Sequence, residues 1–336
     1  MRSGMRVLAG LVFLAVACLA CAAPGPPPPP GQGRSLLVRA EAVALAPDHP
    51  RRKNLGRLTY LGGLELSSPD PAFGGLSGLW VSPDGGRLWA ISDQGWWLRA
   101  KLIHGPGGAP ASISQARLGP LLDPGGNPLQ GKRNKDAEGL AAQGGGFLVT
   151  FERDHRLWRY PAPLGLTGKP QPLSLPAWLK ASPRNQGVEA MTVLADGRIL
   201  LLAEDATGGA HTLGALGDGT HWQKVTYRLH TDFKPTALAA LPGGGCLVLE
   251  RAYSPALGAR ARLGFLPPEQ IKPGAKLSPI NLAALSPPLT TDNFEGLAVI
   301  PAPAGGWRVY LLSDDNYSPM QRTLLLAFHL HPEPWR

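Results

Sequence analysis

The chain has 336 residues, of which 43 are glycine, 36 are proline and 43% are hydrophobic. A chain of this composition can bury a sizeable core, so it is not a disordered polymer, and its glycines and prolines indicate many turns between short strands. Three cysteines exclude a disulfide scaffold and a cysteine-rich zinc site. The net charge of +9 favours anionic partners in general.

The N-terminus has the pattern of an export signal. Two arginines precede an apolar run at residues 7–19, which is too short to span a bilayer, and small residues follow. Either cleavage within residues 20–22 or lipidation of Cys21 fits, and the spacer PGPPPPPGQG at residues 24–33 favours a lipid anchor. We predict a signal peptide at 1–20, a Pro-rich tether at 21–34 and one domain at 35–336. The protein would be a periplasmic or outer-membrane-anchored lipoprotein, or else secreted.

One module recurs along the rest of the chain: a short apolar run, a Gly-rich turn and a second apolar run. Such β-hairpins span residues 79–91, 140–150, 190–203, 237–249 and 297–312. Their entry positions, 47 to 61 residues apart, are Ser77, Glu138, Glu189, Thr236 and Glu295. This period is typical of an all-β propeller of four-stranded antiparallel blades, with room for five to six blades, and an all-β sandwich is the alternative. The last apolar run, residues 323–330, should pair with an early strand near residues 57–66 and close the ring.

Each hairpin carries polar residues at its open end. Residues equidistant from a turn face each other, so Glu189 pairs with Glu204 across one turn and Glu138 with Glu152 across another. In a propeller these ends would meet at one mouth of the central channel. The acids expected there are Asp93, Glu138, Glu152, Glu189, Glu204, Asp205, Glu250, Glu295, Asp314 and Asp315.

So many carboxylates repel one another unless their charge is offset. Calcium takes six to eight oxygen ligands, which a carboxylate ring supplies. Basic residues also lie beside the acids in sequence, namely Arg153, Arg251 and the run Lys132-Arg133-Asn134-Lys135 just before Asp136, and guanidinium groups suit phosphate or another oxyanion. The alternative is an ordinary polar rim in which the acids pair with these bases. Ser77 lacks the G-x-S-x-G spacing of a nucleophile, so we expect it to form a hydrogen bond at a strand end.

A series of short motifs resembles the phytase-like family described as having esterase-like activity. The matching segments are FGGLSGL at 73–79, WAISD at 89–93, DAEGL at 136–140, FER at 151–153, GVEA at 187–190, LAED at 202–205, LER at 249–251, NFEGL at 293–297, LSDDN at 312–316 and QRTLLL at 321–326. The resemblance implies a six-bladed β-propeller exported in bacteria and distantly similar to β-propeller phytases. In those phytases, calcium at the channel mouth binds and polarises the phosphate.

We therefore predict a six-bladed propeller that hydrolyses phosphate or other anionic esters with the help of Ca²⁺. The predicted metal ligands are Glu138, Glu189, Glu204, Glu295, Asp314 and Asp93. Arg153, Arg251 and Lys135 would bind the anionic oxygens, and Glu152 or Glu250 would take a proton.

Two other functions stay open at this point. One is a lactonase-like metal-dependent hydrolase, and the other is a non-catalytic ligand-binding or scaffold propeller of the cell envelope. The expected partners are a small anionic, phosphate-bearing ligand or ester, and a membrane through the lipid anchor only. We expect no binding of nucleic acid, because no stripe of lysines and aromatic residues is present. We also expect the protein to be a monomer.

Overall fold

The computed structural model describes residues 31–205 and 207–332. The predicted signal peptide and most of the predicted tether lie outside these residues. Within the described part, no helix is long and apolar enough to cross a membrane.

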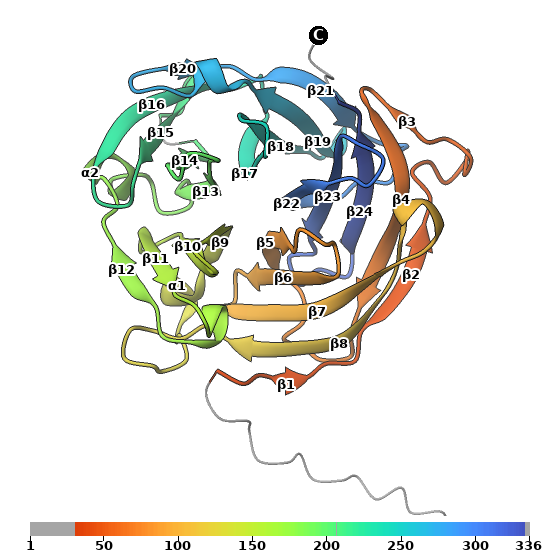
Figure 1. The fold of residues 1–336 in the computed structure, drawn as a ribbon, viewed down its shortest axis with the longest axis horizontal. Helices are drawn as coiled ribbons and strands as arrows, with labels where there is room; N and C mark the ends of the chain where they lie inside the picture. The colour runs from red at the N-terminus through yellow and green to blue at the C-terminus, as the bar shows by residue number, and fades with distance from the viewer. Residues whose placement is uncertain (1–30, 206, 333–336) are drawn as a thin grey trace, which may run out of the picture.

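The described residues form a ring of five antiparallel blades around a central channel (Figure 1). Blade 1 contains β5 (Leu76–Val81), β6 (Arg87–Ser92), β7 (Trp96–His104), β8 (Pro110–Pro120) and β1 (Arg34–Ser35). Blade 2 contains β9 (Ala137–Gln143), β10 (Gly146–Phe151), β11 (Arg156–Tyr160) and β12 (Gln171–Leu173). Blade 3 contains β13 (Val188–Val193), β14 (Ile199–Ala203), β15 (His211–Gly217), β16 (Trp222–Arg228) and β20 (Lys276–Leu277), the last one parallel to its neighbour.

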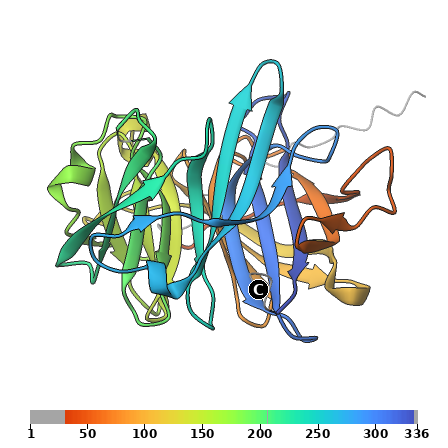
Figure 2. The same cartoon turned by 90° about the horizontal axis from the view of Figure 1, so that it is seen from above.

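Blade 4 contains β17 (Lys234–Ala240), β18 (Cys246–Ser254), β19 (Gly258–Leu266) and β21 (Ile280–Leu285). Blade 5 contains β22 (Asn293–Pro301), β23 (Trp307–Asp314), β24 (Thr323–Leu330), β4 (Leu58–Ser67) and β2 (Arg39–Val43), with β3 (Asn54–Leu55) beside β4. The two short α-helices described are α1 (Lys132–Lys135) and α2 (Ala177–Lys180). Figure 2, seen from above, shows the β18–β19 hairpin rising beyond the neighbouring blades.

The prediction of six blades is wrong, because the structure has five, with four to six strands each. The two innermost strands of every blade are one of the five hairpins that the sequence reveals, and the described residues form no sixth innermost hairpin. The remaining length goes elsewhere: residues 34–67 add outer strands to blades 1 and 5, and long connections follow β8, β11 and β19. Dividing the chain length by the repeat period therefore overestimates the number of blades.

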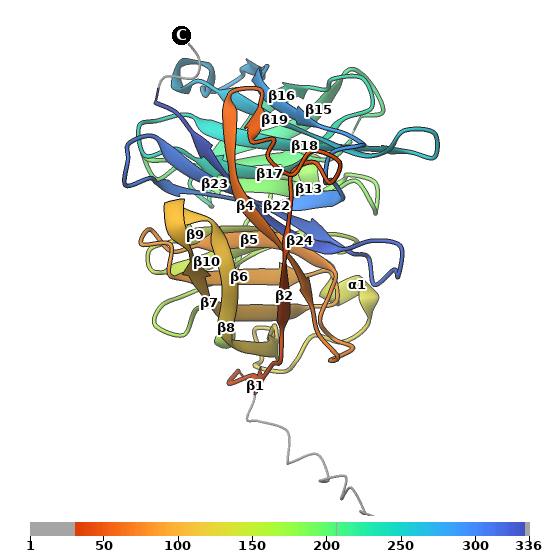
Figure 3. The same ribbon diagram turned by 90° about the vertical axis from the view of Figure 1, so that its right-hand side faces the viewer.

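The predicted ring closure is confirmed. In β24, Thr323 pairs with Leu66 and Leu330 pairs with Leu58, so the last strand of the described chain lies beside the early strand β4. Figure 3 shows β2, β4 and β24 together on the outside of blade 5. Because β24 also pairs with β23, the early strand β4 and the last strands of the described chain are held in one sheet, which removes an open edge from the ring.

The core consists of apolar layers between neighbouring blades. The largest layer joins blades 4 and 5 through side chains such as Leu249, Leu263, Phe294 and Phe328, all at most 1% exposed. Successive side chains of each strand point alternately into the apolar layers on the two sides of its blade, so each sheet is buried on both faces. These layers fix the inner strands, and the inner strands fix the geometry of the channel.

All five inner strands carry a β-bulge near the same end. The pairing register shifts at Ser77, at Glu138–Gly139, at Glu189, at Thr236 and at Glu295. A bulge bends its strand and redirects a side chain. Each blade therefore has one redirected polar residue at the equivalent position near the start of its inner strand. At Gly139 a Cβ atom would lie 2.7 Å from the carbonyl oxygen of Glu189, so only glycine permits this close approach of two inner strands.

Candidate functional site at the channel mouth

The five bulge residues meet at a small cavity in the channel. A cavity of about 10 Å³, room for roughly one water-sized sphere, is lined by Ser77, Glu138, Glu189, Thr236 and Glu295. The hydroxyl of Ser77 donates a hydrogen bond to the carbonyl of Ala137 (2.6 Å), and that of Thr236 donates to the carbonyl of Phe294 (3.1 Å). The serine and threonine thus tie neighbouring blades together, and three glutamates remain around the axis.

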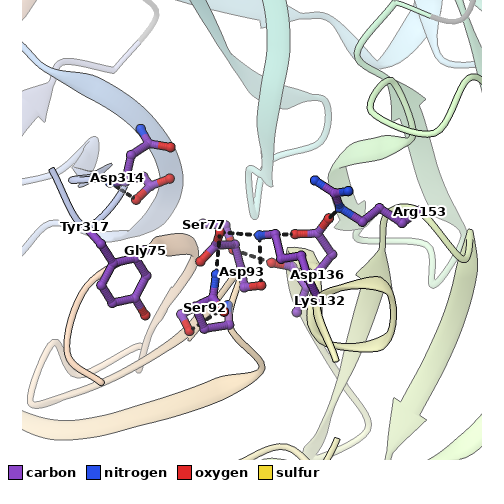
Figure 4. A network of polar contacts seen from close by, with 12 residues as sticks. Gly75, Ser77, Ser92, Asp93, Lys132, Asp136, Arg153, Asp314 and Tyr317 are labelled. Atoms are coloured by element: carbon purple, nitrogen blue, oxygen red, sulfur yellow. Dashed lines mark hydrogen bonds and ion pairs between the residues drawn. The ribbon is translucent and has the colours of Figure 1, made fainter. Parts of the chain in front are cut away.

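Beside this cavity, α1 places the cation Lys132 between two blades. Lys132 lies between Asp93 and Asp136, at 2.5 and 2.6 Å from their carboxylate oxygens, and Arg153 binds the other oxygen of Asp136 at 2.5 Å (Figure 4). Asp93 follows the end of β6 in blade 1, whereas Asp136 precedes β9 and Arg153 follows β10 in the inner hairpin of blade 2. The network therefore joins the mouths of blades 1 and 2.

Three carboxylates of blade 2 are close enough to share one metal ion. Asp136, Glu138 and Glu152 each offer an oxygen, and these oxygens lie within 4.8 Å of one another. Calcium–oxygen distances of about 2.3–2.6 Å place two ligands at most about 5 Å apart, so the spacing fits a hard cation with oxygen ligands. Asp136 is nearly buried, and Glu138 makes no hydrogen bond or ion pair with any side chain that the structure describes.

Charge counting supports a divalent ion at this cluster. Lys132 and Arg153 are the two cations paired with the carboxylates, and the four carboxylates are those of Asp93, Asp136, Glu138 and Glu152. When all four carboxylates are ionised, two negative charges are left over, which equals the charge of one divalent ion. Burial, reinforced by Glu189 and Glu295, raises the pKa of Glu138 well above its usual range.

Glu152 has the properties of a group that can exchange a proton near neutral pH. One of its oxygens accepts a hydrogen bond from the backbone amide of Gly187 at 2.6 Å, and its side chain is almost fully buried. Burial raises the pKa of Glu152 to about 7, although the Gly187 amide opposes the shift. The carboxyl can therefore be either proton donor or proton acceptor near pH 7.

On the other side of the channel, Arg251 lies among three carboxylates. Its Nη2 atom is 3.3 Å from Glu204, 3.4 Å from Glu295 and 3.9 Å from Glu189. Burial disfavours the charge of Arg251, but the three carboxylates outweigh this and raise its pKa. The structure thus brings four of the predicted site residues together, with a guanidinium among three predicted metal ligands.

The carboxylates of blade 5 have different environments. Burial, with Glu295 nearby, raises the pKa of Asp314 to about 9, and Asp314 accepts a hydrogen bond from the amide of Asn316 at 2.6 Å. Asp315 instead binds the amide of Gly75 at 2.9 Å and the hydroxyl of Thr323 at 3.0 Å. Asp314 therefore belongs to the mouth, whereas Asp315 holds blades 1 and 5 together.

Two other predicted acids lie at the edge of this arrangement. Burial raises the pKa of Asp93, and its Oδ1 atom is buried without a hydrogen-bond partner among the described atoms. Asp205 forms an ion pair with Lys234. Asp93 thus retains an unfilled acceptor beside the Lys132 network, whereas Asp205 is neutralised by its own neighbour.

Glu250 does not join the group around Arg251. It is fully buried between blades 3 and 4, 3.3 Å from Arg262 and beside Tyr227. Because Glu250 and Arg251 are neighbours in one strand, their side chains point to opposite sides of blade 4. Only Arg251 faces the other carboxylates of the channel.

An open cleft adjoins the Lys132 network. Its volume is about 620 Å³, and its lining includes Asp93, Lys132, Lys135, Trp96 and Tyr317. Figure 4 shows Tyr317 across from Asp93 and Lys132. The cleft thus offers two lysines and two aromatic side chains next to the candidate metal ligands.

Sequence reasoning assigned no site role to Asp136, Lys132 or Tyr317. The signal for Asp136 was present in the segment DAEGL, where it stands two residues before Glu138. Comparing residues equidistant from a turn finds partners inside a hairpin, but it does not detect side chains that precede the hairpin or come from a connecting helix. Asp136 precedes its hairpin, and Lys132 comes from the connecting helix α1.

Fold and site together define a five-bladed propeller with a carboxylate-lined mouth. Residues 71–317 match the family of phytase-like proteins described as "Esterase-like activity of phytase", and the chain belongs to this family, which confirms the predicted resemblance. No curated protein matches the sequence significantly.

Among solved structures, the chain is similar to a glutaminyl cyclase from Myxococcus xanthus, at 14% identity over 77% of this chain and 91% of that one, with a TM-score of 0.40. It is also similar to the gluconolactonase XC5397 from Xanthomonas campestris, at 12% identity over 88% and 99% of the two chains, with a TM-score of 0.40. At this level of similarity, the activities of those proteins are not transferred to this chain.

Proposed function

We propose that this protein is a divalent-cation-dependent hydrolase of anionic esters, phosphate esters above all, acting at the mouth beside blade 2. The observation that carries the proposal is the cluster of Asp136, Glu138 and Glu152, whose oxygens lie within 4.8 Å of one another. The family described by esterase-like activity supports the reaction class. The all-oxygen donor set favours calcium or magnesium over a transition metal.

The proposed ion would be held by Asp136 and Glu138, with Glu152 completing the set or exchanging a proton. When bound, a divalent ion polarises an ester and lowers the pKa of a water molecule. Lys132 and Arg153 hold Asp136 in place through both of its oxygens. The predicted ligands Glu189, Glu204 and Glu295 surround Arg251 instead, so the proposal does not require a second ion there.

Substrate binding is assigned to the 620 Å³ cleft next to this cluster. Lys132 and Lys135 line the cleft, and Arg153 lies behind Asp136. An anionic ester would place its oxygens against these cations, and its organic group would lie against Trp96 and Tyr317. Glu152, with a pKa of about 7, would accept the proton of the attacking water.

The test is an activity panel with and without calcium. The protein, treated with a chelator and then supplied with Ca²⁺, is assayed on a phosphomonoester, a phosphodiester, a carboxyl ester and a lactone. We expect calcium-dependent cleavage of a phosphate ester, reduced at least about 100-fold in kcat/KM by Glu138→Gln. The matched control Glu269→Gln, an exposed glutamate far along the chain, should keep full activity.

Each other outcome selects a different function. Cleavage of the lactone alone would favour a lactonase-like hydrolase, which does not need the lysines of the cleft. No cleavage of any substrate, with the fold intact, would leave a ligand-binding or scaffold propeller. Either result would overturn the proposed phosphoesterase activity.

The place of action is proposed from residues 1–30 alone, which contain the predicted signal peptide and Cys21. We propose export to the cell envelope with a lipid on Cys21. The mass of the mature protein distinguishes a chain that begins with a lipidated Cys21 from one cut without lipidation.

A further inference from the structure

A second, larger cleft lies between blades 1 and 2, on the side of the molecule where the inner hairpins make their turns. Its volume is about 1120 Å³, comparable to the upper range of ligand pockets. Blade 1 lines it with residues of β5 to β8, and blade 2 lines it with residues 145–147 and the loop 163–167. Because β5 and β9 both start at the mouth, this cleft opens at the opposite end of the same blade interface.

The register of blade 1 aligns the lining residues on one face of the sheet. Trp80 pairs with Trp89, Trp89 with Arg99, and Arg99 with Arg117, so one row crosses four strands. Residues directly opposite each other in antiparallel strands share a face. The row therefore presents two indole rings near the channel and two guanidinium groups toward the outside, all toward blade 2.

A second row of the same face adds two more cations. Arg87 of β6 pairs with Lys101 of β7, two residues along each strand from the first row. Like charges placed directly opposite each other are destabilising, and here the pairs Arg87–Lys101 and Arg99–Arg117 both occur on one face. Such repulsion is relieved when an anion lies between the cations.

No described carboxylate fulfils that role. The lining of the cleft contains no aspartate or glutamate, and Arg87, Arg99 and Lys101 form no ion pair with the acids that the structure describes. Asp84, which feels the charge of Arg87, lies in the adjoining turn and binds Ser82 and the amide of Gly86. Arg117 is held by the backbone carbonyls of Gln32 and Gly33 at 2.7–3.2 Å, so its position is fixed.

The floor of the cleft is aromatic and rigid. Phe147 packs against Trp80 at 5.5 Å between ring centres, nearly edge-on, and against Trp89 at 5.6 Å. The guanidinium of Arg99 lies 5.4 Å from the centre of the Trp89 ring. Both tryptophans are only half-buried, so the floor can receive a flat ring while the cations meet its charge.

We propose that this cleft binds a small molecule that combines an aromatic ring with an anionic group such as a carboxylate, sulfonate or phosphate. The ring lies on Trp80, Trp89 and Phe147, and the anionic group lies between the two rows of cations. This site is separate from the carboxylate cluster at the mouth, so the proposal does not depend on the proposed hydrolysis.

The test uses naphthalene-2-sulfonate as the probe and calorimetry on the full chain as the measurement. Inorganic sulfate carries the charge without the ring, and 2-naphthol carries the ring without the charge. The variant Arg99→Gln/Lys101→Gln removes one cation from each of the two rows. The control Arg51→Gln/Arg52→Gln removes the same charge from the exposed connection between β2 and β3, whose arginines line neither cleft.

We expect saturable binding of naphthalene-2-sulfonate to the wild-type protein, with Kd at least about tenfold lower than for 2-naphthol or sulfate. Arg99→Gln/Lys101→Gln should weaken it at least tenfold, and the control should not. All four substituted side chains are partly or fully exposed, so both variants should fold, which their melting temperatures check.

Equal loss of binding in both variants would show attraction to overall charge only, and equal binding of 2-naphthol would show a simple apolar surface. Each of these outcomes would overturn the proposal, as would the absence of saturable binding to the wild-type protein. Arg99→Gln alone, with a smaller loss of affinity, provides a second test should the double variant fold poorly.

Discussion

The two ends of the interface between blades 1 and 2 carry opposite charge. At the mouth, Asp136, Glu138 and Glu152 are gathered at the starts and ends of hairpins and are wholly or largely withdrawn from water. At the turn side, Arg87, Arg99 and Lys101 project from regular strand positions and are exposed. The difference shows how burial decides the fate of like charges, because buried acids change their pKa or bind a cation, whereas exposed cations stay charged and are screened by salt.

The largest effect should come from removing Arg251, the cation shared by three buried carboxylates of the channel. Arg251→Met leaves Glu189, Glu204 and Glu295 without their shared partner. We expect a loss of about 3–5 kcal/mol in the free energy of unfolding at pH 8, measured by urea denaturation. The control Arg198→Met breaks the exposed pair with Asp196 and should lower it by less than about 1 kcal/mol. Similar losses in both variants would contradict the contrast between buried and exposed charge.

The next effect is stabilisation by calcium. At a Ca²⁺ concentration 100 times the Kd, one bound ion should raise the free energy of unfolding by about 2.7 kcal/mol. Asp136→Asn and Glu138→Gln should each abolish most of this gain, because each removes a proposed ligand. Glu269→Gln is the matched control and should keep it. A gain that survives both ligand substitutions would place the ion elsewhere.

The pH dependence of the metal-free protein should have an unusual sign. Glu152 and Asp314 have pKa values raised to about 7 and about 9, mainly by burial, so the folded state binds protons that the unfolded state has released. Their contribution is therefore fully present below about pH 4 and lost as the pH rises through 7 and then 9. We expect urea denaturation in a chelator to show a decline of several kcal/mol between pH 5 and pH 9. Added calcium should reverse part of this decline, and a rise in stability over that range would refute the assignment.

The smallest effect on the free energy of unfolding should come from the cation-rich cleft, where substitution should stabilise the protein. Arg99→Gln/Lys101→Gln relieves two like-charge cross-strand contacts, so the free energy of unfolding should increase by about 0.2–1 kcal/mol at low salt. Thermal denaturation at 20 mM and 500 mM NaCl checks this, because screening should remove the gain at the higher concentration. A clear loss of stability at low salt would mean that these side chains are held by contacts other than those described.

The sequence predicts local features well where geometry along one hairpin decides them. The five hairpins, the polar residues at their open ends and the pairing of Thr323–Leu330 with an early strand follow from turn positions and apolar runs. The number of blades does not, because residues 34–67 could build either a sixth blade or the outer strands of other blades. Only the contacts between distant segments decide between these.

The candidate site was predictable to the same extent. Glu138 and Glu152 could be expected at the mouth from their distance to one turn, but Lys132, one partner of Asp136, comes from α1, whose place no hairpin rule gives. Glu250 and Arg251 illustrate a second limit. Which of two neighbouring residues faces the channel depends on where a bulge falls in the paired strands, and a shift of one residue exchanges their sides.

The most direct test of the account is a calorimetric titration of the chelator-treated protein with Ca²⁺ at pH 7, repeated in two buffers of different ionisation enthalpy. Because Glu138 and Glu152 have raised pKa values, ion binding should release protons, so the observed heat should depend on the buffer. The account predicts one ion per chain, net proton release, and loss of both in Asp136→Asn/Glu138→Gln. Absence of binding, or binding of the same strength by that double variant, would contradict a metal site at this mouth.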